Sequence, residues 1–400
     1  MIINRRNFIQ QSGLLVAGSW LAPQFLQAHQ YQHSLTNPRK LVVIQLSGGN
    51  DGLNTIVPYR NDEYYRVRPK IAIPKNRVLK GDDTLGFHPA LSGLKELYDE
   101  GWLTVLNGVG YPNPDRSHFR SMDIWQSGSD SDQIWSTGWI GRYLDATCAD
   151  SDQPQLAVEV EDSLSLALKG EHIKGLALKD PQKLYNTLRS KQIPSDAEAR
   201  QVGKENENLA YLYKTLVEAR SSAQYVAEKV KTKKVSHEYP KGELSNSLKS
   251  IARMILAGVD TQVYYTTLSG FDTHIRQNPQ QEKLLSQYAD AVHAFVNHLH
   301  TEGQLDNVLV LTFSEFGRRV AQNASQGTDH GTANNLFLIG SQLKKPGFFN
   351  ELPSLSDLQD GDLKFSVDFR RVYATLLDQW LDIPHKQILK QSYDGLPLLA

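Results

Sequence analysis

Six short runs of β-branched and apolar residues constrain the fold of this chain more than any other feature. They cover residues 40–46, 103–107, 156–160, 262–268, 308–313 and 336–340. Apolar residues at helical spacing lie between them, at residues 90–100, 118–126 and 282–300. Strands that are apolar on both faces and alternate with helices are typical of a sheet covered on both sides. The sequence therefore predicts an α/β fold, a three-layer αβα sandwich around a mostly parallel central sheet.

The predicted α/β domain extends from residue 40 to residue 400. Residues 180–249 differ from the rest because they are rich in Lys, Glu, Gln and Ala and nearly free of glycine. We interpret them as a helical insertion in the domain. Apolar residues at helical spacing in residues 365–381 predict a packed helix near the end of the domain.

The N-terminus has the order of an export signal. Arg5 and Arg6 precede Phe8 and a short apolar run over residues 13–22, which resembles a twin-arginine (Tat) signal peptide. We expect a signal over residues 1–28, a linker over residues 29–39, transport by the Tat translocase, and a periplasmic or secreted protein. The alternative is a chance arginine pair before a core helix. The poor cleavage motif leaves anchoring by an uncleaved signal open.

Charge and cysteine content exclude several classes of protein. The 43 Lys and Arg residues nearly balance 44 Asp and Glu residues, so we expect no nucleic-acid partner. Cys148 is the only cysteine, which excludes an intramolecular disulfide framework and a cysteine-based zinc site. A metal would have to be bound by Asp, Glu, His or hydroxyl groups, which suit zinc, manganese or iron.

Polar residues with metal-binding or acid–base chemistry follow the predicted strands. In open α/β sheets, ligands gather at the carboxyl ends of the strands, so these residues form one candidate site. They are Asp51, then Asp115, Arg116, Ser117 and His118, then Asp272 and His274, then Glu315 and Arg318, and finally Asp329 and His330.

Each motif also has a purely structural interpretation. Asp51 lies in a glycine-rich turn, where Asp often bonds its own backbone. Ser117 precedes a helical pattern, as an N-cap residue does. Asp272 with His274 could form a loop hydrogen bond, and Asp329 with His330 a salt-bridged turn. The functional hypothesis depends on all of them occurring at one sheet edge.

Four motifs together resemble a known family. They are LSGGNDGLN at residues 46–54, the SHF…W..SG segment at residues 117–128, GFDTH at residues 270–274, and TFSEFGR…N.S.GTDHGT at residues 312–332. This combination resembles the Tat-exported domain-of-unknown-function family 1501, which is assigned to the alkaline phosphatase and sulfatase superfamily. The resemblance covers essentially the whole chain from residue 40 and implies an alkaline phosphatase-like fold.

The resemblance also implies roles for the candidate residues. It makes Ser117 the nucleophile or oxyanion-facing hydroxyl and Arg318 a catalytic group that holds substrate oxygens. The implied metal ligands are Asp51, Asp272, His274, Glu315, Asp329 and His330. The implied substrate-binding residues are Asn50, Arg116 and His118. The superfamily usually separates its paired Asp and His by three residues and has Asp-His where this chain has Glu315-Phe316, so two metals, one or none remain open.

Two functions follow from these expectations. The first is an exported, metal-dependent hydrolase of a phosphate or sulfate ester, with a small oxyanion ester as substrate. The second is a non-catalytic exported binding or scaffold protein that kept the fold but lost part of the site, with another exported protein as partner. The sequence leaves open whether the chain is an enzyme at all.

Overall fold

The computed structural model describes residues 38–148, 153–189 and 207–400 of the chain. The predicted Tat signal and most of the predicted linker fall on residues 1–37 and lie outside the described residues. Among the described residues, no helix combines the length and apolar character needed to span a bilayer.

A nine-stranded sheet forms the centre of the described domain. Its strands are β1 (Lys40–Ser47), β5 (Leu103–Gly110), β6 (Ala157–Glu159), β7 (Leu176–Ala177), β8 (Val263–Ser269), β9 (Val308–Phe313), β10 (Asn334–Ile339), β11 (Gly347–Phe348) and β14 (Val367–Asp368). The order is β11-β5-β10-β9-β1-β8-β6-β7, with β14 also paired to β5. Only β10 is antiparallel to its neighbours among these strands. The prediction of a mostly parallel central sheet is confirmed.

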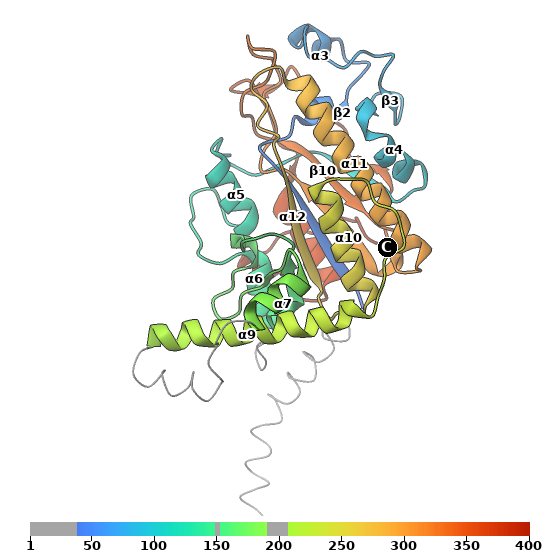
Figure 1. Cartoon of the computed structure of the whole chain (residues 1–400). Coiled ribbons are helices and arrows are strands. Elements are labelled where there is room, and N and C mark those ends of the chain that lie inside the picture. The colour runs from blue at the N-terminus through green and yellow to red at the C-terminus, as the bar shows by residue number, and fades with distance from the viewer. Residues whose placement is uncertain (1–37, 149–152, 190–206) are drawn as a thin grey trace, which may run out of the picture. The chain divides into compact units, whose positions relative to one another are not determined.

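Helices lie on both faces of the sheet (Figure 1). Those of the first face are α4 (Ser92–Asp99), α9 (Glu207–Lys231), α10 (Glu243–Leu256) and α11 (Gln277–Thr301). Those of the second face are α5 (His118–Ser127), α6 (Trp139–Thr147), α12 (Phe369–Thr375) and α13 (His385–Leu389). The remaining helices are α2 (Gly52–Thr55), α3 (Asp62–Val67) and α7 (Pro181–Arg189). The three-layer prediction is therefore confirmed.

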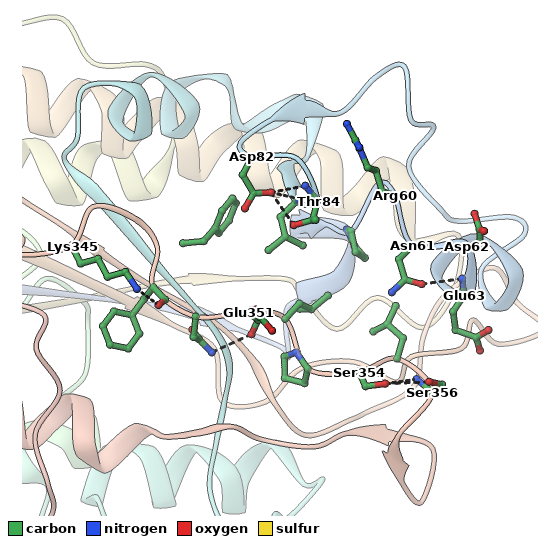
Figure 2. Close-up of a pocket in the computed structure, with 18 residues that line it drawn as sticks. Arg60, Asn61, Asp62, Glu63, Asp82, Thr84, Lys345, Glu351, Ser354 and Ser356 are labelled. Atoms are coloured by element: carbon green, nitrogen blue, oxygen red, sulfur yellow. Dashed lines mark hydrogen bonds between the residues drawn. The ribbon is translucent and has the colours of Figure 1, made fainter.

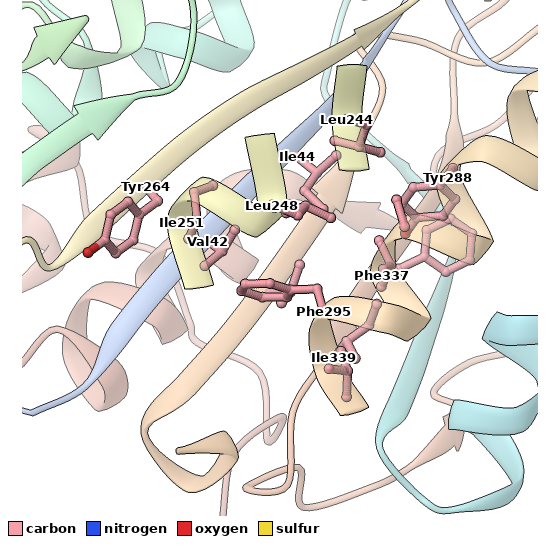
Figure 3. Close-up of a cluster of buried hydrophobic side chains, with 14 of the residues drawn as sticks. Val42, Ile44, Leu244, Leu248, Ile251, Tyr264, Tyr288, Phe295, Phe337 and Ile339 are labelled. Carbon is pink, nitrogen blue, oxygen red and sulfur yellow. The ribbon is translucent and has the colours of Figure 1, made fainter. Parts of the chain in front are cut away.

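The side chains of β1 alternate between the two faces of the sheet, so this strand contributes to the apolar core on each face. Val42 and Ile44 belong to the apolar cluster that contains α10 and α11, whereas Leu41 and Val43 belong to the cluster on the other face. Figure 3 shows Val42 and Ile44 directed toward Leu248 of α10 and its neighbours. Successive side chains of a strand point to opposite faces, so a strand buried on both sides is apolar throughout.

The described residues also form two small sheets, and the C-terminal segment differs from the helix predicted for it. The additional strands are β2 (Ile56–Val57), β3 (Leu79–Lys80), β4 (Gly86–Phe87), β12 (Leu358–Gln359) and β13 (Asp362–Leu363). The single helix predicted over residues 365–381 is wrong in its first part, because β14 pairs with β5 there. Asp368 then caps α12 by accepting a hydrogen bond from Arg370 N, and a π-helical turn, Leu376–Trp380, follows.

Residues 180–249 contain α7, α9 and the start of α10 in the described parts. Leu244 and Leu248 of α10 are buried in the same apolar cluster as Val42 of β1. This helix therefore covers the central sheet directly. The interpretation of the whole segment as an insertion stays a prediction.

Candidate metal centre

Loops at the carboxyl ends of the parallel strands bring the candidate residues together. The loops after β1, β5, β8 and β9 meet at this edge, together with the segment that leads into β10. Arg318 and His330 form a backbone bridge between the last two segments, and Arg319 N donates to the carbonyl of Asp329 at 3.0 Å. The sequence predicted this edge because the candidate residues follow the carboxyl ends of the predicted strands.

Two glycines allow the loops to approach so closely. Gly48 has a φ of +116°, and a Cβ there would lie 2.5 Å from the backbone nitrogen of Asp272. Gly49 has a φ of +68°, and a Cβ there would meet the Phe316 ring at 2.2 Å. Both positions combine a left-handed conformation with a close neighbour, so only glycine fits without displacement. The SGG turn after β1 thus positions the Asp272 loop.

Three histidines converge on one oxygen of Asp272. The distances from Asp272 Oδ1 to the Nε2 atoms are 2.9 Å for His274, 3.3 Å for His330 and 3.4 Å for His118. The Nε2 atoms of His274 and His330 are 3.0 Å apart. Ligands of a tetrahedral zinc ion with bonds near 2.0 Å lie about 3.3 Å from one another. The side chains of His118, Asp272 and His330 form a group of possible metal ligands whose donor atoms lie within 4.8 Å of one another. We call Asp272 and the three histidines the histidine cluster.

An oxygen behind each imidazole faces its Nδ1 atom. His118 Nδ1 lies 2.8 Å from Glu315 Oε1, His330 Nδ1 lies 2.7 Å from the carbonyl of Arg116, and His274 Nδ1 lies 3.3 Å from an oxygen of Asp329. These pairs lie outside the cluster and determine which ring nitrogen of each imidazole carries the proton. An N–H at each Nδ1 leaves the Nε2 lone pair free to face the cluster, which is the arrangement found around metal-bound histidines.

The Nε2 atom of His118 is an unsatisfied buried group. It has no hydrogen-bond partner among the described residues, and its nearest carboxylate oxygen is Asp272 Oδ1. Buried polar atoms nearly always have partners. Three imidazole nitrogens and one carboxylate oxygen also match the ligand preference of zinc. On both grounds, the residues of the histidine cluster fit a divalent metal ion.

Neighbouring charges shift the pKa values of the cluster. Burial alone would raise the pKa of Asp272, but the hydrogen bond and charge of Arg318 and the contact with His330 lower it to about 2. The hydrogen bond to Glu315 raises the pKa of His118. Burial lowers the pKa of His330. A carboxylate that remains ionised beside an imidazole whose protonation is disfavoured, as at His330, is suited to bind a cation.

Glu315 and Asp329 lie behind the histidines and not at Asp272 Oδ1. The Glu315 carboxylate is fully buried and accepts a hydrogen bond from Gly48 N at 2.8 Å besides contacting His118. Asp329 also accepts one from Asn323 at 3.1 Å, and that hydrogen bond lowers its pKa. Their contacts orient the imidazoles; direct metal ligation by either residue stays a prediction.

Asp51 and Asn50 are held in a separate buried network. Asp51 Oδ2 accepts hydrogen bonds from Arg68 at 2.6 Å and Gln277 at 2.5 Å, and the Asp51 and Arg68 side chains have no exposed surface. Asn50 bonds Thr55 through its side-chain amide at 2.8 Å. A cation at Asp51 would have to displace the guanidinium of Arg68. No local sequence pattern predicts this pairing, because it depends on how two loops fold together.

Arg318 is surrounded by backbone oxygens. It donates to the carbonyls of Gly48, Gly49, Phe271 and Thr328 and to Asp272, and its side chain is fully buried. Its donors hold three loops together and leave none directed to solvent. Arg116 is different: the only side-chain hydrogen bond found for it among the described residues goes to Asp362, and its side chain is 40% exposed.

Ser117 occupies the N-cap position of α5 without capping it. Its hydroxyl makes no cap hydrogen bond, and its backbone N–H donates to Asp115 Oδ1 at 2.6 Å. Ser117 is exposed and directly precedes His118 of the histidine cluster. The hydroxyl is therefore available for another role.

Phe316 supports two of the histidines. Its ring centroid lies 4.7 Å from that of His118 and 4.9 Å from that of His330. From the sequence, Phe316 is significant only because it stands where the superfamily usually has a histidine ligand. A large aromatic residue directly after Glu315 could have signalled a wall against which imidazoles pack.

Another cavity lies away from the histidine cluster. It measures about 770 Å³ and is lined by residues from three segments, 58–63, 82–85 and 345–356, none of which belongs to the histidine cluster. Figure 2 shows hydrogen bonds within these segments, such as those of Asp82 with Thr84 and of Lys345 with the Phe349 carbonyl.

Comparisons with known proteins give one family and several distant structures. A family model described as "Protein of unknown function (DUF1501)" matches residues 104–395. No curated protein matches the chain in sequence. The chain is similar to the C-terminal periplasmic domain of EcEptC from Escherichia coli, with 12% identity, coverage of 87% of this chain and 83% of that one, and a TM-score of 0.39.

Two further structures are similar at the same level. The lipoteichoic acid synthase LtaP from Listeria monocytogenes has 11% identity, coverage of 82% and 74%, and a TM-score of 0.34. The phosphonate monoester hydrolase SpPMH from Silicibacter pomeroyi has 9% identity, coverage of 90% and 78%, and a TM-score of 0.35. Likenesses this distant carry no argument about the chemistry of this chain.

Proposed function

The chain belongs to the DUF1501 family of proteins of unknown function, and from that premise we propose that it is a metal-dependent hydrolase of phosphate or sulfate esters. The observation that carries the proposal is the histidine cluster, in which three imidazole Nε2 atoms face one carboxylate oxygen. Two lone-pair nitrogens 3.0 Å apart, His274 and His330, repel each other unless a proton or a cation lies between them. The ligands we assign are His118, Asp272, His274 and His330.

The charges around the cluster support a divalent ion. Asp272, Glu315 and Asp329 supply three carboxylates, and Arg318 supplies one guanidinium. With all three imidazoles neutral, as metal binding requires, two negative charges remain uncompensated. A zinc, manganese or iron(II) ion balances them, and the nitrogen-rich ligand set favours zinc.

When bound, the metal would polarise the ester and lower the pKa of a coordinated hydroxyl group. Ser117 contributes an exposed hydroxyl next to His118, at the N-terminus of the ten-residue helix α5, where backbone N–H groups favour a bound anion. Arg116 has guanidinium donors to spare for the oxygens of a phosphate or sulfate group. The oxygen of Ser117 or of water would form the new bond to phosphorus or sulfur while the bond to the alcohol oxygen breaks, and the alcohol would leave with the proton given up by the attacking hydroxyl group. Where Ser117 attacks, a water molecule would then hydrolyse the seryl ester and release phosphate or sulfate.

Arg318 and Asp51 take positioning roles in this proposal. The buried guanidinium of Arg318 fixes the loops that carry Asp272 and His274. Asp51, paired with Arg68, holds the turn after β1. Neither residue needs to contact substrate.

One observation favours the second function, a non-catalytic binding or scaffold protein. Asp272 already has a cationic partner in Arg318 at 2.7 Å, and Asp51 has one in Arg68. Both carboxylates are thus compensated within the chain. A metal-free protein could keep this arrangement if one histidine of the cluster carried an additional proton.

The experiment is a hydrolysis screen with protein loaded with zinc, manganese or iron(II), using phosphate and sulfate monoesters. We expect activity in the wild-type protein, at least a hundredfold loss in Ser117→Ala or His330→Ala, about the size of removing a nucleophile or a metal ligand, and no change in His293→Ala. His293 is a matched control because it pairs with Glu96 outside the cluster. Loaded, folded protein without activity on any ester would favour the scaffold.

Export through the Tat translocase is part of the proposal. The pair Arg5-Arg6 precedes an apolar run in the sequence. Replacement of both arginines by lysine should retain the protein in the cytoplasm, measured by fractionation. Unchanged export of the double variant would contradict the Tat assignment and leave the site chemistry untouched.

A further inference from the structure

A smaller cavity, of about 290 Å³, lies directly beside the histidine cluster. Two residues that line the cavity also contact the cluster. Phe316 lines the cavity and packs against His118 and His330. Arg116 also lines the cavity, and its backbone carbonyl oxygen faces His330 Nδ1. These shared neighbours place the cavity next to the histidine cluster.

Aromatic rings form much of the cavity wall. Tyr111 and Phe316 are buried, whereas Phe365 keeps 38% of its surface exposed. Few large apolar side chains of the described residues are exposed to this degree. An exposed ring at the mouth of a cavity offers a face against which a flat ligand can stack.

Polar side chains with free hydrogen-bonding groups complete the wall. Asn113 and Gln359 line the cavity, and no side-chain hydrogen bond is found for either within the described parts of the chain. Arg116 spends one nitrogen on Asp362 and retains its other donors. Trp125 also lines the cavity, and its indole N–H is buried without a partner among the described residues. The cavity therefore combines free hydrogen-bond donors and acceptors with aromatic rings, unlike a purely apolar cavity.

We propose that this cavity binds the alcohol part of the ester and that this part is a single sugar ring. The inference rests on the proposed function for the position of the ester group. A sugar ring has apolar C–H faces, which suit Phe365 and Tyr111, and hydroxyls along its edge, which suit Asn113 and Gln359. Ligand pockets for drug-sized molecules begin at roughly 300 Å³, so the cavity holds one ring and not an extended chain.

The test compares ring and linear alcohols on the metal-loaded protein. The probes are the phosphate and sulfate monoesters of hexoses and of glycerol, and the free hexoses themselves. Phe365→Ala removes the exposed ring of the cavity. Phe119→Ala is its matched control, because Phe119 is 80% exposed and does not line the cavity.

We expect wild type to prefer hexose esters, and Phe365→Ala to lower kcat/KM for them about tenfold, the size of one lost ring contact. The value for glycerol esters should stay the same, and Phe119→Ala should change neither. Equal effects of Phe365→Ala on both kinds of ester, or no effect, would overturn the inference while the hydrolase function stands.

Binding of free hexoses separates the two proposals. Saturation-transfer NMR should detect a hexose on wild type and Phe119→Ala protein but not on Phe365→Ala protein, whether or not any ester is hydrolysed. Binding without hydrolysis would contradict the proposed hydrolase and support the sugar cavity. No binding of any hexose to the wild-type protein would overturn the sugar cavity.

Discussion

At the scale of single residues, the histidine cluster depends on side chains that do not contact Asp272 Oδ1 themselves. Glu315 illustrates this best: its buried carboxylate contacts His118 Nδ1 at 2.8 Å and holds the turn after β1 through Gly48 N. It both orients the imidazole and adds negative charge behind it. Partners of this kind typically change metal affinity as much as some direct ligands do.

Glu315→Gln should therefore weaken zinc binding about 10- to 100-fold. The amide keeps the shape of the side chain but removes the charge behind His118. Competition with a chelator of known affinity measures the change. Glu100→Gln serves as control because Glu100 is exposed. If Glu315→Gln bound zinc as tightly as this control, Glu315 would have no role in metal binding.

Glu159 provides a pH-dependent test that is separate from the cluster. Burial raises its pKa to about 7, although Ser165 N donates a hydrogen bond to it at 2.6 Å. Because the pKa is higher in the folded than in the unfolded chain, its contribution to stability is complete below pH 4.5 and is lost as the pH rises toward 7. Ionisation of this buried group costs about 3 kcal/mol across that window.

Glu159→Gln should remove this loss. The free energy of unfolding of the variant relative to wild type should shift by about 3 kcal/mol in favour of the variant between pH 4.5 and pH 7.5. Denaturant titrations at several pH values measure it. Parallel pH curves for the two proteins would show that Glu159 ionises normally in the fold.

At the scale of elements, the sequence predicted the strands of the central sheet well. Strands buried on both faces, such as β1 and β9, are continuous apolar runs that differ from their surroundings. The two-residue strands β11 and β14 could not be predicted, because two residues show no period. The failure over residues 365–381 has this cause.

The site was predictable to the level of loops but not of contacts. The positions of Asp272, His274 and His330 after predicted strands assigned them to one edge of the sheet, where the structure brings them together. Sequence reasoning assigned His118 to substrate, whereas its Nε2 faces Asp272. The pairing of Asp51 with Arg68 depends on packing between distant segments, which no local pattern encodes.

Helix α10 offers a test of element packing. Leu248 is fully buried against the central sheet in the same cluster as Val42. Leu248→Ala should lower the free energy of unfolding by about 2–5 kcal/mol, whereas Asn246→Ala, on the exposed side of the helix, should change it by less than about 0.5 kcal/mol. Thermal and denaturant unfolding measure both. Equal, small effects would show that α10 packs loosely, as a detachable insertion would.

At the scale of the whole molecule, a bound ion would join loops from several strands. His118, Asp272 and His330 follow β5, β8 and β9 in the chain. An ion that binds only the folded state stabilises it by about 4 kcal/mol at a concentration a thousand times its Kd. Zinc should therefore raise the Tm by on the order of 5 °C over chelator-treated protein, measured by calorimetry. A Tm that does not respond to zinc, manganese or iron(II) would argue against a site that links the loops.

The most direct test of the account is the metal content of the purified protein, measured by plasma mass spectrometry beside an Asp272→Ala/His330→Ala double variant and the His293→Ala control. The account predicts close to one equivalent of a transition metal in wild type and control and its loss in the double variant. Wild-type protein that is folded, metal-free and unable to take up zinc, manganese or iron(II) would contradict it.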